Sequence, residues 1–229
     1  TNTLGMKFVP VPGTKVQFCI WETRVKDYAA YAAANAGVDG GWKNFGRGGF
    51  KQADTHPVVN VNWNDANAFC AWLTKKELAE GKIKAGQKYR LPTDAEWSVA
   101  VGLGQEKGNT PQEKSRGIKD VYPWGKEWPP PKGAGNYSKS LMVDKFDYTS
   151  PVGSFAANKL GLHDMGGNVW EWCEDKFIPT NTRRVQRGGS WRDYFHPDRL
   201  WSSRRYDGPP GGDYHDIGFR CVLVGGSGG

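Results

Sequence analysis

Beyond residue 176 this sequence contains no lysine and no glutamate. The last Lys is Lys176 and the last Glu is Glu174, although nineteen Lys and nine Glu occur up to that point. Between Arg192 and Asp216, glutamine, methionine and asparagine are absent as well. Residues 192–216, which we call the Lys-free stretch, therefore have a composition of their own. The origin of this stretch bears on whether the chain is an enzyme or a binding protein.

Cysteine is scarce too, because the chain has only Cys19, Cys70, Cys173 and Cys221. No two of them form a CxxC pair or join a Cys/His cluster, which argues against a zinc knuckle or a thioredoxin-like motif. Two disulfides, one disulfide or four buried thiols all remain open.

Long apolar runs are missing. No secretory apolar segment and no run near membrane-spanning length occurs, so we predict no membrane span. The chain starts in mid-phrase at "TNTLGMKFVPVPG", which leaves open an upstream signal or domain and a place at the cell surface or in the cytoplasm. The tail 225–229 is typical of a linker.

The net charge of +7 comes from scattered Lys residues. Because no basic stripe or recognition-helix signature accompanies it, we predict no nucleic-acid partner.

Tryptophan is abundant, with eleven residues, several of them beside Gly or Pro. Large rings held in irregular chain suggest a core built partly from packed loops. Hydrophobic periodicity, caps and turn residues predict a single α+β domain over 1–224. We expect a hairpin in 6–22, helices in 23–37, 64–81 and 93–102, loop over 103–162, and strands in 56–63, 89–92, 168–175, 184–191 and 217–224.

Six phrases resemble the formylglycine-generating enzyme family, also called sulfatase-modifying factors. They are "HPVVNVNWNDANAFCAWL", "YRLPTDAEW", "YPWG", "PVGSFAANKLGLHDMGGNVWEWCED", "RVQRGGSW" and "IGFRCVL", and they occur in order over about residues 5–224. The resemblance implies a C-type-lectin-like fold with two main helices, small antiparallel sheets and much ordered loop. It does not by itself imply the activity, because fold and function separate readily.

Active members of that family oxidise a substrate cysteine with two cysteines that bind copper upstream of the final GFRC motif. Thiolates suit this role because they are soft ligands that favour Cu(I). The resemblance maps these two positions onto Pro197 and Ser202, and neither residue supplies a thiolate. Cys221 matches the GFRC cysteine, which is not part of the catalytic pair. We therefore expect no copper and no oxidase activity.

The resemblance also implies two calcium sites, whose carboxylate, amide and backbone oxygens suit a hard cation. The alternative is that the acidic residues are ordinary turn or surface residues. The implied ligands are Asn136, Tyr137, Asp144 and Phe146 at one site, and Asp164, Gly167, Val169 and Glu171 at the other.

The composition of the Lys-free stretch matches a codon rule. Asn codons ending in a pyrimidine and randomised at their first two bases cannot yield Lys, Glu, Gln, Met or Trp. They do yield the Tyr, Asp, His, Ser, Gly, Arg, Pro and Phe found here, with Trp201 as the exception. The region 187–221 thus resembles the variable region of diversity-generating retroelement proteins. The residues that would vary and bind ligand are Arg192, Asp193, Tyr194, Phe195, His196, Arg199, Arg204, Tyr206, Asp207, Gly208, Asp213, Tyr214, His215 and Asp216.

These residue types make a good contact surface, since Tyr and Phe bring rigid apolar area and Arg brings forked donors. An ordinary Gly/Pro-rich surface loop is the alternative. His196 or His215 beside an Asp could act as a general base or metal ligand. No nucleophile in a fitting context accompanies them, because Ser190 and Ser202 lack an elbow motif.

The sequence thus favours a non-catalytic ligand-binding protein on a calcium-stabilised scaffold, whose ligand is a protein or a cell surface. Two alternatives remain. One is a formylglycine-generating-type oxidase acting on sulfatase cysteines, and the other is a sensor domain cut from a larger bacterial protein such as a kinase.

Overall fold

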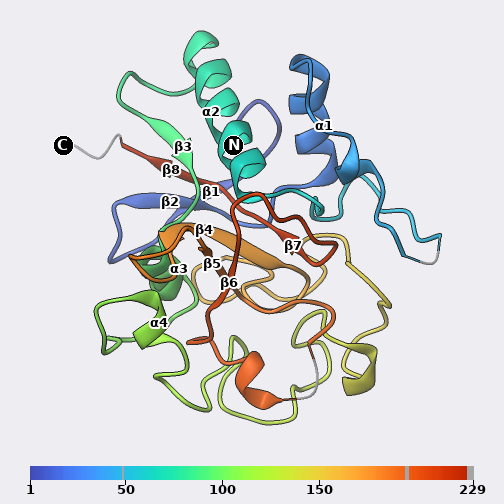
Figure 1. Cartoon of the computed structure of the whole chain (residues 1–229), viewed down its shortest axis with the longest axis vertical. Coiled ribbons are helices and arrows are strands. Elements are labelled where there is room, and N and C mark those ends of the chain that lie inside the picture. Colours follow the sequence, from blue (N-terminus) through green and yellow to red (C-terminus); the bar gives the residue numbers. More distant parts are fainter. Residues whose placement is uncertain (48, 194–195, 226–229) are drawn as a thin grey trace.

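The computed structural model describes residues 1–47, 49–193 and 196–225. Two four-stranded sheets occupy the middle of the molecule, and the two longer helices lie together at one end of it (Figure 1). They are α1 (Val25–Ala34) and α2 (Trp63–Ala79). Long loops fill the opposite end, as the scarcity of periodic residues in 103–162 predicted.

The first sheet joins the two ends of the chain. Its order is β1 (Phe8–Pro10), β2 (Val16–Cys19), β8 (Val222–Val224) and β3 (Lys88–Arg90), and each neighbouring pair is antiparallel. The predicted hairpin is confirmed as β1 and β2. Because β8 lies between β2 and β3, the chain that follows the Lys-free stretch is fixed to the N-terminal part of the molecule.

The second sheet contains one strand of the Lys-free stretch and one strand that directly follows it. Its order is β6 (Tyr206–Gly208), β5 (Arg184–Arg187), β4 (Trp170–Lys176) and β7 (Ile217–Gly218). All pairs are antiparallel except β4 with β7, which is parallel. Since β6 and β7 are the two edge strands, the segment between them crosses the end of this sheet.

Two short helices precede the second sheet, namely α3 (Asp94–Ala100) and α4 (Pro111–Lys114). A capping box begins α3, because the Thr93 hydroxyl accepts the Glu96 N–H at 3.1 Å and the Glu96 carboxylate accepts the Thr93 N–H. The remaining turns are 3₁₀ helices at Gly41–Lys43, Lys139–Leu141 and Pro197–Arg199.

Three details of the predicted elements were wrong. Residues 56–63 form no strand, since Asn60 takes a positive φ of 54° that interrupts the extended run. The predicted strand 217–224 splits into β7 and β8, which belong to different sheets. Helix α1 covers only Val25–Ala34 of the predicted 23–37, and the backbone of Thr23 bonds Phe219 and Val58 instead.

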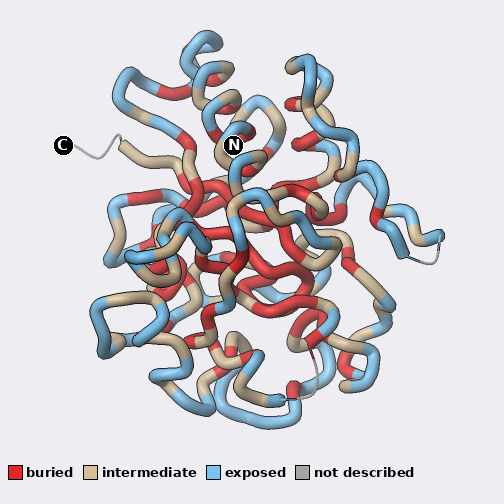
Figure 2. The backbone as a smooth tube through the Cα atoms, in the orientation of Figure 1, coloured by how far each residue is buried: buried red, intermediate tan, exposed pale blue. Residues whose placement is uncertain are grey.

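The core runs through both sheets and into the loops (Figure 2). Trp97, Trp172 and Phe219 are fully buried among the strands. In the long loop Tyr122 stacks on Trp124 with ring centroids 4.7 Å apart, which confirms that packed rings hold irregular chain. Among the helices of the described residues, none combines the length and apolar character that a bilayer crossing requires.

Candidate functional site

A cavity of about 540 Å³ opens over the second sheet, between its edge strands β6 and β7. Strands β4 and β5 supply part of its lining, and the Lys-free stretch supplies the rest. Its lining comprises Trp170, Arg183, Gln186, Arg192, Asp193, Arg199, Arg204, Tyr206, Asp207, Gly208, Pro209, Tyr214, Asp216 and Ile217. We call this the arginine pocket.

Two tyrosines stand exposed in the arginine pocket. Tyr206 is 51% and Tyr214 47% exposed, although few large apolar side chains are. The Tyr206 ring lies 5.8 Å from the Trp170 ring, which positions it from β4. The sheet register places Gln186 opposite Tyr206, so the two side chains share one face of the sheet.

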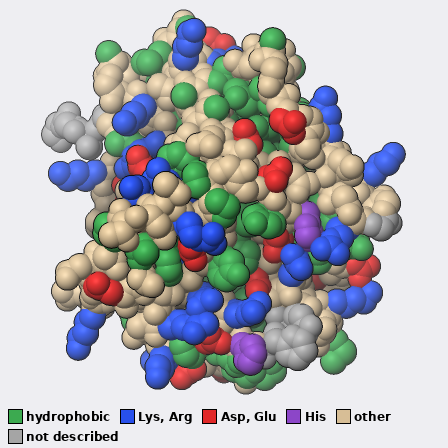
Figure 3. Space-filling view, viewed as in Figure 1, with side chains coloured by type: hydrophobic (Ala, Val, Ile, Leu, Met, Phe, Trp, Pro, Cys, Tyr) green, Lys and Arg blue, Asp and Glu red, His purple; other side chains and the backbone are tan. Residues whose placement is uncertain are grey.

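Charges alternate around the rim. The Arg192 guanidinium lies 3.5 Å from Asp216, and Arg199 lies 3.7 Å from Asp193. Arg183 pairs with Asp207 in the same way. Figure 3 shows Lys and Arg side chains gathered on this side of the molecule, interspersed with apolar and acidic ones.

Asp193 lines the pocket, but its carboxylate bonds within the protein. One oxygen accepts the Ser190 N–H at 2.9 Å and the Trp170 indole N–H at 3.0 Å. Burial raises the pKa of Asp193 above its ordinary value. Gly208 is buried as well, and a Cβ there would lie 2.6 Å from Gln186 Nε2. These two positions shape the pocket more than they present a contact surface.

The other residues predicted for the contact surface are dispersed. His196 and Asp213 are exposed, and neither lines the arginine pocket. His215 packs against Phe45 and Trp191 and accepts a hydrogen bond from Arg47 at 3.2 Å. Tyr194 and Phe195 lie outside the described residues.

The sequence analysis did not predict five of the lining residues. Four of these five lie outside residues 192–216, the stretch of unusual composition, and Pro209 lies inside it. The five residues are Trp170, Arg183, Gln186, Pro209 and Ile217. The sequence held one signal for Gln186, because a polar residue within the predicted strand 184–191 can mark a position that contacts a ligand. Strand pairing, which sequence alone did not give, brings β4 and β5 beneath the stretch.

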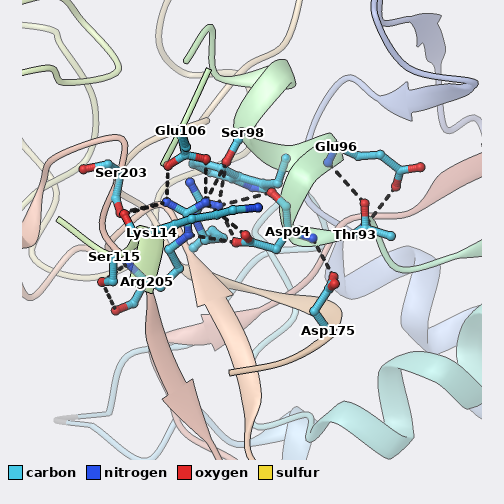
Figure 4. A network of polar contacts seen from close by, with 12 residues as sticks. Thr93, Asp94, Glu96, Ser98, Glu106, Lys114, Ser115, Asp175, Ser203 and Arg205 are labelled. Atoms are coloured by element: carbon cyan, nitrogen blue, oxygen red, sulfur yellow. Dashed lines mark hydrogen bonds and ion pairs between the residues drawn. The ribbon is translucent and has the colours of Figure 1, made fainter. Parts of the chain in front are cut away.

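The Lys-free stretch is anchored from below by a buried ionic network (Figure 4). Arg205 donates to both Asp94 oxygens at 3.0 and 2.9 Å and also pairs with Glu106. Arg187 donates to the same Asp94 at 2.6 Å. These arginines lower the pKa of Asp94 against the opposing effect of its burial. Such a network holds the stretch rigidly over α3.

At the first implied calcium site, the Asp144 carboxylate accepts the backbone N–H groups of Tyr137 at 2.9 Å and Phe146 at 2.8 Å. Asn136 is fully buried, and its Oδ1 has no hydrogen-bond partner in the described part of the chain. A buried amide oxygen beside a carboxylate fits a hard cation.

At the second implied site, Glu171 is already paired. Its two oxygens accept from Arg220 at 2.8 and 2.6 Å, and one also accepts the Trp97 indole N–H. Asp164 and Glu22 instead each keep one buried oxygen without a partner among the described residues. Burial and their mutual repulsion raise the pKa of Glu22, and burial raises that of Asp164.

Three buried carboxylates, Glu22, Asp164 and Glu171, therefore lie near one buried arginine, Arg220, so negative charge is in excess there. Glu22 was missed by the sequence prediction, because it lies far from the motif that suggested the site. Among residues 1–47, 49–193 and 196–225, no three His, Cys, Asp or Glu side chains converge as a metal cluster. Amide and backbone oxygens would have to complete either site.

Pro197 and Ser202, onto which the resemblance maps the family's catalytic cysteines, do not line the arginine pocket. Pro197 begins the 3₁₀ turn, and Ser202 is buried with its hydroxyl unpartnered by any described residue. All four cysteines are free and buried, and burial raises the pKa of Cys19 to about 12. The Sγ atoms of Cys70 and Cys221 lie 3.5 Å apart. No thiol occupies the two catalytic positions.

Comparison with known proteins supports the family. The model of the sulfatase-modifying factor enzyme 1-like domain matches residues 5–224. An inactive C-alpha-formylglycine-generating enzyme 2 from Bos taurus is 34% identical over 76% of this chain and 52% of its own length. A formylglycine-generating enzyme from Thermomonospora curvata is 32% identical over 73% of this chain and 55% of its own. The chain thus spans about half the length of these relatives.

Solved structures share the fold at low sequence identity. PvdO from Pseudomonas aeruginosa aligns with a TM-score of 0.65 and 23% identity, covering 96% of this chain and 91% of its own. Variable protein 1 of Treponema denticola aligns with a TM-score of 0.56 and 22% identity, covering 95% and 91%. The predicted lectin-like fold of the formylglycine-generating type is thereby confirmed. By sequence and by structure, this chain belongs to the family of the sulfatase-modifying factor enzyme 1-like domain.

Proposed function

We propose that this chain is a non-catalytic binding domain whose ligand contacts the arginine pocket and its rim. The observation that carries the proposal is the convergence of the compositionally distinct stretch on one hollow. Nine residues predicted to contact ligand line it, namely Arg192, Asp193, Arg199, Arg204, Tyr206, Asp207, Gly208, Tyr214 and Asp216.

The scaffold beneath supports such a role. The Asp94 network and the β5–β6 pairing hold the stretch on regular structure, so exposed side chains are presented on a rigid base. Rigid presentation of tyrosines lowers the entropy cost of binding. Substitutions at exposed positions such as Tyr206 or Tyr214 would alter the contact surface without touching the core.

The loss of oxidase activity is supported by Pro197 and Ser202, since neither can provide the thiolate that copper needs. One of the similar proteins is itself named as inactive, which shows that the family includes such members. The oxidase alternative has no comparable support in the described residues. A sensor role within a larger chain is compatible with the binding proposal.

Calcium is proposed as a structural ion at the sites around Asn136 and Asp164. When bound, it would neutralise buried carboxylates and hold loop segments together. Asn136, Asp144, Asp164 and Glu22 supply the side-chain oxygens that fit this role.

The binding proposal is tested by selection from a displayed random-peptide library. Immobilised wild-type protein should enrich peptides that the double variant Tyr206→Ala/Tyr214→Ala no longer retains. The melting temperature of the double variant should equal that of the wild type. Leu78→Ala is the matched control, because Leu78 is 41% exposed on α2, away from the pocket. Enrichment that survives the double substitution, or that Leu78→Ala also abolishes, would contradict the proposal.

The origin of the stretch is tested separately, by sequencing the DNA that flanks the gene. A near-copy of codons 187–221, differing only at adenines and lying beside a reverse-transcriptase gene, would establish diversification. Its absence would leave an ordinary surface loop.

A further inference from the structure

Arg204 differs from the other arginines of the pocket. Four arginines and three aspartates line the hollow, and each aspartate lies beside one arginine, namely Arg183, Arg192 or Arg199. Arg204 forms no ion pair with any described carboxylate, and its Nε is buried without a hydrogen-bond partner there. Burial and the nearby Arg116 lower its pKa, although Asp198 opposes the shift. The pocket therefore holds one positive charge in excess.

A second unpartnered group lies in the same pocket lining as Arg204. Gln186 is only 1% exposed, and both its Oε1 and its Nε2 lack partners among the described residues. A buried side-chain amide with both groups unmatched is costly, so it marks a place where something else binds. Tyr206 lies directly opposite Gln186 on β6, and both residues line the pocket.

The two groups together define a ligand chemistry. A guanidinium with free donors is best satisfied by a carboxylate, which it binds through charge-assisted hydrogen bonds. An amide with a free N–H and a free C=O is best matched by another amide, because each supplies what the other lacks. Tyr206 and Tyr214 add apolar walls of the kind that surround peptide ligands.

We propose that the arginine pocket binds a peptide segment that carries a carboxylate, with Arg204 pairing the carboxylate and Gln186 pairing a peptide group. This rests on the proposed function and names its ligand class. The carboxylate comes from an acidic side chain or from a chain end, and both present the same group to Arg204. Neutral peptides leave the excess charge unpaired and bind more weakly.

Three blocked amino acids serve as probes. N-acetyl-glutamate amide carries a side-chain carboxylate, N-acetyl-glutamine with a free carboxyl carries a chain-end carboxylate, and N-acetyl-glutamine amide is the neutral match. Binding is followed by chemical-shift changes in the ¹⁵N spectrum of the full chain. At least one anionic probe should bind about tenfold or more tightly than the neutral one, and added salt should reduce the difference.

Substitutions locate the effect. Arg204→Gln should abolish the preference for the anionic probes, whereas Arg184→Gln should preserve it. Arg184 lies on β5, stacks on Trp63 at 3.8 Å and does not line the pocket, so it controls for loss of one charge. Gln186→Met should weaken all three probes while sparing the preference, because it removes the amide and keeps the shape.

Equal binding of anionic and neutral probes would overturn the inference, and so would binding of none of them. A uronic acid that bound as tightly as the best peptide probe would also overturn it, since it lacks the peptide group. The library selection with Tyr206→Ala/Tyr214→Ala does not depend on charge. Its success alongside failure of these probes would leave the proposed function standing and remove only the ligand class.

Discussion

Arg204 and Arg205 are neighbours in the chain, yet their guanidinium groups lie in opposite surroundings. Arg204 lines the arginine pocket, while the Arg205 side chain has no exposed surface and donates to Asp94, Glu106 and Ser98. Both residues directly precede β6, which begins at Tyr206, yet only the Arg205 guanidinium reaches the buried Asp94 carboxylate. One stretch of unusual composition thus contains both contact and core arginines.

Replacing Arg205 with Met should destabilise the protein by about 3–5 kcal/mol, because it leaves the Glu106 carboxylate without its ion pair and leaves Asp94 with Arg187 alone. Replacing Arg204 with Met should cost less than about 1 kcal/mol, since no ion pair is lost. Urea unfolding followed by tryptophan fluorescence measures both changes. Equal losses would contradict the assignment of Arg205 to the core.

His215 predicts a pH dependence at the same scale. Burial, assisted by Arg47 and Arg192, lowers its pKa from 6.5 to about 4. The unfolded chain therefore takes up this proton first as the pH falls, so the stabilising contribution is present above pH 6.5 and is lost toward pH 4. Because the ring is partly solvated, the loss should be about 1 kcal/mol.

The measurement compares the free energy of unfolding at pH 7 and pH 4.5. His215→Gln should flatten the difference, whereas Leu78→Ala, at an exposed position on α2, should leave it unchanged. A wild-type slope in His215→Gln would show that other groups cause it.

At the scale of elements, helix α3 is short but central. Its first residue, Asp94, holds both Arg187 and Arg205, so the position of its N-terminus sets the position of β5 and β6. Thr93 and Glu96 fix that N-terminus by reciprocal side-chain to backbone bonds. The capping box therefore helps to fix the Asp94 carboxylate, which pairs with Arg187 and Arg205.

Thr93→Ala should lower the free energy of unfolding by about 1 kcal/mol, as is usual for loss of an N-cap hydroxyl. Thr93→Ser keeps the hydroxyl and should retain most of that stability. Thermal unfolding of the two variants side by side tests this. If both variants lost the same stability, the cap would not be the cause.

At the scale of the whole molecule, charge balance inside the protein sets a requirement. Glu22, Asp164 and Glu171 are all buried near the single buried Arg220. Arg220 compensates only one of these negative charges, so a proton or a cation has to compensate the others. Calcium bound there would connect the N-terminal hairpin to the loop that precedes β4.

Saturating calcium should therefore raise the melting temperature, and chelation should lower it. At free calcium about a hundredfold above Kd, the stabilisation should reach about 3 kcal/mol. Glu22→Gln/Asp164→Asn should diminish the response, while Leu78→Ala should keep it. An unchanged melting curve with and without chelator would argue against a structural calcium ion.

Much of the fold could be predicted from local signals. The hairpin of β1 and β2, helix α2 and the capping box of α3 depend on turns, periodicity and caps that a short window contains. The interruption at Asn60 and the division of 217–224 could not, because both follow from contacts with distant segments. Arg220, for example, lies between β7 and β8 and pairs with Glu171 of β4.

By itself, the sequence determined the family, the loss of a thiolate at Pro197 and Ser202, and the unusual composition of 192–216, because residue identity alone carries these properties. Only the tertiary structure decided which residues of that stretch line the arginine pocket. Tertiary contacts place Arg204 in the pocket and Arg205 against Asp94, and strand pairing brings Gln186 opposite Tyr206. Composition is uniform along the stretch, but burial is set by partners far away in the chain.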